Sequence, residues 1–350
     1  MSFAERAAQS VSKYWPGCVI ALVTAVVADR VAGSVPGLSG LLLALAAGIV
    51  LRVAGWVPWW AERGLDWCSR TPLLAGVALL GLHFVVDDVR AYGWPLLGAT
   101  ALAAYAACGI GMLAGRMVQV KAPTSLHLAV SGAGGADMGG TPTGGEGPNG
   151  VLSHGRFGLV ASGAIGVLIF IGLAQMTQGA GWLADAAQPA GATDQLVMWA
   201  GLGLPHSALA VAALEATAHI STGEAMGFAA LATAAALVMA RAVMLAPLRW
   251  FPRRGTEQAN QELMRPLLRS WYIPAFAVLA VYRASAGISP GLEETTTAII
   301  TMLLSIGLVA WGSSLRLPAA WRGAWRETTV AMIVVVCAVC VGGAAVWLIT

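Results

Sequence analysis

The sequence predicts an all-α integral membrane protein that crosses the bilayer many times, on two observations. Hydrophobic residues make up 58% of the 350 residues and charged residues only 11%, against about 25% charged in ordinary soluble domains. The apolar residues also come in uninterrupted runs of roughly 17–25, the length that a helix needs to cross about 30 Å of hydrocarbon. A transmembrane barrel is excluded because the strands of a barrel alternate polar and apolar residues, and these runs do not.

The runs divide into about eleven membrane elements, with nine as the lower count, in a single domain over residues 1–350. The elements are predicted at 14–33, 36–55, 71–86, 92–118, 124–147, 157–178, 195–218, 224–248, 270–286, 295–315 and 328–349. Residues 56–70 mix four tryptophans with charged residues, which predicts a helix that lies at the membrane interface.

Lysine and arginine gather in alternate loops, which predicts the orientation in the cell (inner or plasma) membrane. These residues are Arg6, Lys13, Arg63, Arg70, Arg116, Lys121, Arg249, Arg253, Arg254, Arg265, Arg269, Arg322 and Arg326. The segment 1–13 and the basic loop 249–269 are then cytoplasmic, and the carboxyl terminus is external. The loop 179–194 has no basic residue, although eleven spans would put it inside. If the fifth and seventh elements are re-entrant, that loop moves outside and the count falls to nine.

The fifth element contains a glycine-rich stretch, residues 131–148, with eight glycines and two prolines. A continuous helix would not tolerate this composition. Unpaired backbone groups are costly in hydrocarbon, so the stretch is expected to line a cavity or to be packed in protein. Transporters build substrate sites from such interrupted helices. A water-exposed loop is the alternative.

The third and tenth predicted elements share a short sequence similarity. Residues 76–81 and 307–312 both begin and end with glycine, and each stretch is followed by a polar turn and a long helix. This similarity indicates inverted repeats with two discontinuous, crossing helices. We expect breaks at 132–143 and 307–314 to face each other near the middle of the membrane, with an anion between the helix amino ends.

Several motifs resemble one known family. They are Trp15-Pro-Gly17, Leu73 to Leu82 with its glycines, Ser131-Gly-Ala-Gly134, Pro205-His206, Arg241 to Pro247, Ile273-Pro-Ala-Phe276 and Ser305-Ile-Gly-Leu308. Their order is similar to the YeiH-type sulfate exporter family, from about residue 15 to the end. The resemblance implies a fold of the bile acid and arsenite transporter type and a sulfur oxyanion as substrate. The chain departs from the family after Gly134 and at Ser207 and Ala210, which marks a divergent branch.

Ionisable groups inside spans are candidates for the site. Asp137 in the glycine-rich break is assigned to coupling, with a water-exposed loop acid as the alternative. His206 follows a predicted helix break and titrates near neutral pH; a ring held by a neighbouring carbonyl is the alternative. Arg241 could anchor an oxyanion through its fork of donors or reach the inner interface. The predicted substrate- or ion-binding residues are Gly132, Gly134, Asp137, Gly139, Gly140, Thr141, Thr143, His206, Arg241, Gly307, Gly312, Ser313 and Ser314.

Two other polar sets are expected to be ordinary. Glu215 and His219, four residues apart near the predicted outer end of a helix, are expected to form a solvated pair. His83 ends the third element, where a polar boundary explains it.

These patterns predict a secondary transporter, an exporter, for a small anion such as a sulfur oxyanion, sulfonate or carboxylate, coupled to protons or Na⁺. The sequence has no nucleotide-binding loop and no defensible catalytic motif, so an enzyme, a cofactor and a metal site are not expected. The net charge of +3 comes from scattered residues, so nucleic acid is excluded as a partner, and the bilayer and the anion are the expected ones. An intramembrane enzyme, a non-transporting sensor or scaffold, and a homodimer remain open alternatives.

Overall fold

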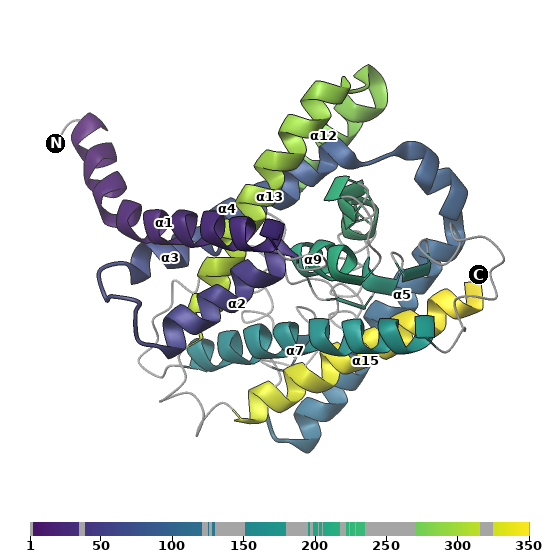
Figure 1. Cartoon of the computed structure of the whole chain (residues 1–350). Coiled ribbons are helices and arrows are strands. Elements are labelled where there is room, and N and C mark those ends of the chain that lie inside the picture. The colour runs from purple at the N-terminus through teal and green to yellow at the C-terminus, as the bar shows by residue number, and fades with distance from the viewer. Residues whose placement is uncertain are drawn as a thin grey trace.

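The structure, a computed structural model, describes most of the chain as packed helices (Figure 1). It covers residues 3–34, 39–120, 125, 128–129, 151–179, 195–196, 199–201, 203–204, 206–217, 222–223, 225–227, 229–234, 271–315 and 325–349. No strand occurs within these residues. The predicted all-α membrane fold is confirmed.

The helices follow the predicted elements closely. They are α1 (Phe3–Ser34), α2 (Gly40–Val53), α3 (Glu62–Cys68), α4 (Thr71–Leu79) with the 3₁₀ turn η1 (Leu80–His83), α5 (Val86–Met117), α7 (Val151–Gly179), α9 (Ser207–Thr217), α12 (Tyr272–Ala286), α13 (Pro290–Ser313) and α15 (Trp325–Ile349). The segments Lys13–Ser34, Pro290–Ser313 and Trp325–Leu348 are long and apolar enough to cross a membrane. The helix predicted within 56–70 is α3. Helices α1, α5, α7 and α13 begin at least five residues earlier than predicted. Most of the predicted elements 124–147 and 224–248 lies outside the described residues.

The short helix α9 lies in the middle of the fold, with longer helices around it (Figure 1). All seven residues from 208 to 214 are buried. The same hydrophobic core draws side chains from α2, α4, α7, α12, α13 and α15. A helix that is buried on all sides is an interior element, so α9 is packed in protein and not in lipid.

Two glycines bring α4 and α13 together at a crossing. A Cβ on Gly76 would lie 2.7 Å from Leu304 Cδ2, and a Cβ on Gly307 would lie 2.6 Å from Leu73 Cδ1. The contacts are reciprocal: each glycine meets the leucine three positions before the other glycine. Adding 231 to the residue number therefore takes Gly76 to Gly307 and Leu73 to Leu304; we call this the shift of 231.

The same shift relates a second pair of close contacts. A Cβ on Gly312 would lie 2.6 Å from the carbonyl oxygen of Leu45 in α2 and 3.0 Å from the nitrogen of Ile49. A Cβ on Gly81 would meet the carbonyl oxygen of Phe276 and the nitrogen of Ala280, in α12. The shift of 231 takes 81 to 312, 45 to 276 and 49 to 280, so the two contacts involve the same backbone atoms at equivalent positions.

Reciprocal contacts of this kind arise when two copies of a unit are related by a two-fold rotation. Here the two units are parts of one chain. The first contains α2, α3, α4 with η1, and α5; the second contains α12, α13 and α15. The last helices of the two units, α5 and α15, also pack against each other. These contacts confirm the predicted internal repeat.

Residues 307–314 do not interrupt a helix, so this part of the site prediction is wrong. Helix α13 is continuous from Pro290 to Ser313, and the chain leaves it only at Ser314. Glycine in a helix costs about 1 kcal/mol relative to alanine. Close packing against another backbone offsets this cost, because a side chain at Gly307 or Gly312 would collide with the neighbouring helix. The other predicted break, at 132–143, lies outside the described residues.

The repeats differ in one helix. The stretch equivalent to α13 is divided in the first repeat into α3 and α4, which begins at Thr71 with Pro72 in its first turn. Proline cannot donate a backbone hydrogen bond and collides with the preceding turn, so it ends α3. The equivalent position in α13 is Leu303, which a helix accepts.

Candidate functional site

The helical segment before α9 is interrupted at His206. The described residues between 195 and 203 are helical, Leu204 is not, His206 lies in a bend, and α9 starts at Ser207. This is the helix break that the sequence predicted at Pro205-His206, although Pro205 itself lies outside the described residues. With 11 residues, α9 is about 16 Å long, roughly half the thickness of the hydrocarbon layer. His206, at its amino end, is buried, so that this end lies inside the fold.

His206 caps the amino end of α9. Its ring is only 2% exposed, and Nδ1 accepts a hydrogen bond of 3.2 Å from the backbone N–H of Ala208. Its carbonyl oxygen accepts from the N–H groups of Leu209 and Ala210. The bond to Nδ1 needs a lone pair there, so the neutral ring carries its proton on Nε2. A proton added to Nδ1 would break the cap.

The carboxyl end of α13 forms the wall opposite His206. The centres of the His206 and Trp311 rings are 6.0 Å apart. The Trp311 ring lies over Gly163 of α7, where a Cβ would come within 2.7 Å of it. The Oγ atom of Ser207 is buried here and has no hydrogen-bond partner among the described residues. The structure thus brings His206 next to the predicted stretch 307–314.

Other predicted site residues have packing or local roles, or cannot be placed. Gly307 and Gly312 are helix contacts, and the hydroxyls of Ser313 and Ser314 donate to the carbonyl oxygens of Ala310 and Trp311. The predicted residues outside the described part of the chain are Gly132, Gly134, Asp137, Gly139, Gly140, Thr141, Thr143 and Arg241.

Glu215, near the other end of α9, is tied to α2. Ser39 Oγ donates a hydrogen bond of 2.7 Å to Glu215 Oε2 and also accepts one from the N–H of Leu42, so that Ser39 caps α2. Glu215 is half-buried. The carboxylate is thus not fully solvated, whereas the expected pair with His219 is untested because His219 lies outside the described residues. Sequence reasoning missed Ser39 because it is far from Glu215 in the chain.

Each repeat holds an ion pair at the equivalent position. Arg52 Nη1 lies 2.9 Å from Glu62 Oε1, and Arg283 Nη2 lies 3.5 Å from Glu293 Oε2. The shift of 231 takes 52 to 283 and 62 to 293. Each pair ties the last turn of one helix, α2 or α12, to the first turn of the next, α3 or α13.

The two ion pairs lie at opposite ends of α13. Glu293 is in its first turn, whereas Gly312, at the other end, contacts Ile49 one turn before Arg52. With 24 residues, α13 is about 36 Å long, enough to cross the hydrocarbon. Equivalent residues of the two repeats therefore lie at opposite ends of α13, an arrangement that agrees with the inverted repeats that the sequence indicated.

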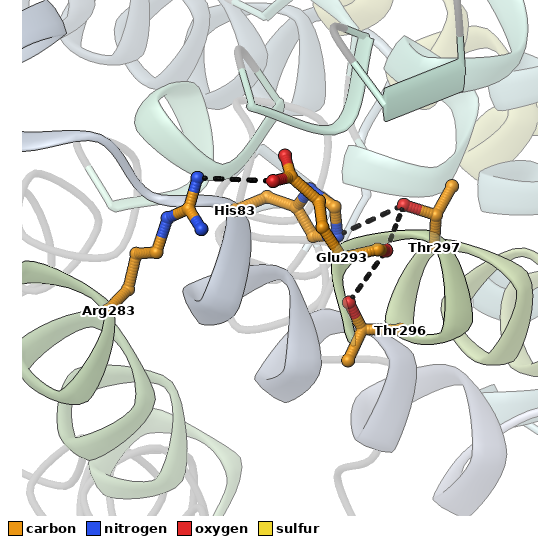
Figure 2. A network of polar contacts seen from close by, with 5 residues as sticks. All are labelled: His83, Arg283, Glu293, Thr296 and Thr297. Atoms are coloured by element: carbon orange, nitrogen blue, oxygen red, sulfur yellow. Dashed lines mark hydrogen bonds and ion pairs between the residues drawn. The ribbon is translucent and has the colours of Figure 1, made fainter. Parts of the chain in front are cut away.

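A polar network surrounds the ion pair of Arg283 (Figure 2). His83, at the end of η1, is 4% exposed, and its Nε2 atom lies 3.4 Å from Thr297 Oγ1. The hydroxyls of Thr296 and Thr297 both donate to the carbonyl oxygen of Glu293. Sequence reasoning took His83 for a polar boundary. Its burial could not be inferred from an apolar run that simply ends there.

Comparisons with known proteins agree with the resemblance found in the motifs. A family model described as conserved hypothetical protein 698 matches residues 16–136. The chain is 24% identical over 314 residues to a UPF0324 membrane protein of Corynebacterium glutamicum, an alignment that covers 87% of this chain and 84% of the relative. No solved structure matches the chain. The predicted resemblance is confirmed, and the chain is similar over most of its length to the YeiH-like UPF0324 membrane proteins.

Proposed function

We propose that the protein is a secondary transporter that exports a small anion, of the sulfur oxyanion, sulfonate or carboxylate class. The observation that carries this proposal is the inverted repeat built around a short, buried helix. Secondary transporters commonly consist of inverted repeats, with the substrate site at an interrupted helix between them. Such a repeat has two related conformations available to it, one open to each face.

The amino end of α9 is the part of the site that favours an anion. The amino end of a helix carries partial positive charge. At the start of α9 the N–H groups of Ala208, Leu209 and Ala210 bond to His206, so it is the dipole of the helix that favours an anion here. Ser207 adds a buried hydroxyl without a partner among the described residues. His206 would add a full positive charge when protonated, at the cost of its bond to Ala208. The Trp311 ring packs beside His206, with the ring centres 6.0 Å apart.

Transport is tested with the purified protein in proteoliposomes. Uptake of radiolabelled sulfate, taurine and acetate would be measured with imposed proton and Na⁺ gradients, which drive a secondary transporter. We expect one anion to accumulate only in vesicles that contain the protein. The proposal would be contradicted if, for every anion, vesicles that contain the protein took up no more than empty vesicles.

A matched pair of serine variants tests the site. Ser207→Ala removes the buried hydroxyl and should raise the KM for the anion about ten-fold, the size expected for one lost hydrogen bond to a charged ligand. Ser285→Ala is the control, since that exposed hydroxyl bonds only to the carbonyl oxygen of Tyr282. Equal KM values for the two variants would remove the α9 end from the site.

A further inference from the structure

Helices α1 and α3 cross with their backbones in contact, at Gly17 and Gly64. A Cβ on Gly17 would lie 2.6 Å from Gly64 Cα, and a Cβ on Gly64 would lie 2.7 Å from Gly17 Cα. A side chain on either glycine would push the two helices apart, so the crossing depends on both. The side chains next to the crossing are therefore held close to one another.

The crossing brings the thiols of Cys18 and Cys68 together. Cys18 directly follows Gly17, and Cys68 lies about one helical turn after Gly64. The two Sγ atoms are 3.3 Å apart, and the Cys68 thiol donates to Cys18 Sγ. Both cysteines are free thiols. Because a disulfide bond is about 2 Å long, the two sulfurs need to approach by only about 1 Å to be joined.

The two thiols differ in their access to solvent. Cys68 is 1% exposed, whereas Cys18 is part-exposed. Burial raises the pKa of the Cys68 thiol, so Cys68 keeps its proton and reacts slowly with an oxidant in solution. Cys18 is therefore the thiol that an oxidant meets first.

The pair lies near the membrane interface. The apolar span of α1 begins at Lys13, and Cys18 is about 8 Å further along the helix. Beside the pair, the rings of Tyr14 and Trp67 stack with their centres 6.2 Å apart. Tyrosine and tryptophan gather at the interface. A small polar oxidant reaches this level without crossing the hydrocarbon.

We propose that Cys18 and Cys68 are a redox-active pair that a peroxide oxidises to a disulfide, which joins α1 to α3. In the orientation predicted from the sequence, this end of α1 faces the cytoplasm, where thiols are kept reduced, so the dithiol is the resting form. This inference goes beyond the proposed transport function and does not depend on it.

The oxidation has two steps. Hydrogen peroxide transfers one oxygen to the Cys18 sulfur, which becomes a sulfenic acid, and the rest of the peroxide leaves as water. The Cys68 sulfur then attacks the Cys18 sulfur and the S–O bond breaks, while the departing hydroxide takes the Cys68 proton and leaves as a second water. The two thiols thus lose two hydrogens and two electrons to one peroxide.

A chain that keeps only these two cysteines tests the reaction. Cys108, Cys337 and Cys340 are replaced by alanine, and the purified protein in detergent is treated with hydrogen peroxide. We expect the protein to lose two hydrogens by mass, and a digest without reductant should yield the Cys18 and Cys68 peptides joined to each other within one molecule. Dithiothreitol should restore both thiols. If the substituted chain does not fold, the same digest is made from the protein with its native cysteines.

Single serine variants separate the roles of the two thiols. With Cys68→Ser, Cys18 has no partner and should stay a sulfenic acid, which dimedone traps. With Cys18→Ser, Cys68 should react with peroxide roughly ten-fold more slowly than Cys18 does in the other variant, because it is buried. Equal rates would contradict the assignment of Cys18 as the first thiol to react.

Thermal unfolding gives an independent measurement. Oxidation should raise the thermal transition by about 5 °C, since the new bond joins residues that are 50 positions apart in the unfolded chain. The Cys68→Ser variant should show no such rise. The inference is overturned if neither thiol reacts, if the Cys18 sulfenic acid persists with Cys68 present, or if the joined peptides come from two molecules. The two sulfurs would then form a packing contact only.

Discussion

The two repeats share their backbone contacts and one ion pair, but differ in most of the side chains around them. Gly81 meets the carbonyl oxygen of Phe276 as Gly312 meets that of Leu45. In contrast, the end of α13 faces His206, and the equivalent end of η1 lies near Gly227. Where two backbones touch, only glycine fits, so the residue at these positions cannot change. The side chains near the site are not restricted in this way and differ between the repeats.

The largest predicted effect tests whether the repeats are packed equally. Gly81→Val and Gly312→Val each put a branched side chain against the backbone of a neighbouring helix, where neither side can move. Both should lower the free energy of unfolding by about 3 kcal/mol, seen as a lower thermal transition in detergent. Gly109→Ala is the control, because nothing lies within 4 Å of its Cβ position. A harmless Gly312→Val would mean that the second repeat is packed more loosely than the first.

A smaller effect should separate the two glycines at the α4–α13 crossing. A Cβ on Gly307 would meet Leu73 at Cδ1, Cβ and Cα, with the last at 3.1 Å, whereas a Cβ on Gly76 would meet mainly the mobile end of Leu304. Gly307→Ala should therefore cost about 2 kcal/mol and Gly76→Ala less than about 1 kcal/mol. Thermal unfolding of the two variants in parallel provides the measurement. Equal losses of stability would show that both sides of the crossing accommodate an alanine side chain equally well.

The helices were largely predictable from the sequence, because uninterrupted apolar runs of membrane length are rare outside membrane-spanning helices. Glycine spacing was ambiguous, since it is equally typical of a broken helix and of a close helix contact. At 307–312 the close helix contact is correct. The same two glycines define the shift that takes Arg52 to Arg283 and Glu62 to Glu293, so the paired ion pairs were within reach of the sequence.

The site was less predictable than the helices. The break at His206 could be expected from its proline, but its contact with Trp311 depends on how α7, α9 and α13 pack, which no local pattern encodes. The contacts of His83 and Ser39 were unpredictable for the same reason, because each bonds to a residue that is far away in the chain.

The next prediction concerns the cap that His206 forms on α9. This contact also distinguishes the two repeats: Trp311 packs beside His206, whereas the equivalent residue of the first repeat is Leu80, which has no ring. His206→Ala and His206→Asn both delete the imidazole, but asparagine keeps a side-chain oxygen that can accept from Ala208. The alanine variant should therefore be about 1 kcal/mol less stable than the asparagine variant. Both should lose any dependence of transport on pH near neutrality. Equal stabilities would show that the Nδ1 bond does not cap α9.

The smallest effect concerns the ion pairs themselves and sharpens the comparison of the two ends. Both pairs are partly exposed to solvent, with side-chain exposures of 17% and 36% for Arg52 and Glu62 and of 20% and 44% for Arg283 and Glu293. Part-exposed pairs contribute little, so double-mutant cycles with glutamine should give coupling energies of about 0.5 kcal/mol for the first pair and about 0.2 kcal/mol for the second. The order follows from the shorter distance and lower exposure of the first pair. Thermal unfolding at low and high salt measures both, since salt should weaken the couplings without changing their order. A stronger coupling between Arg283 and Glu293 would mean that the hairpin of α12 and α13 is the more firmly held of the two.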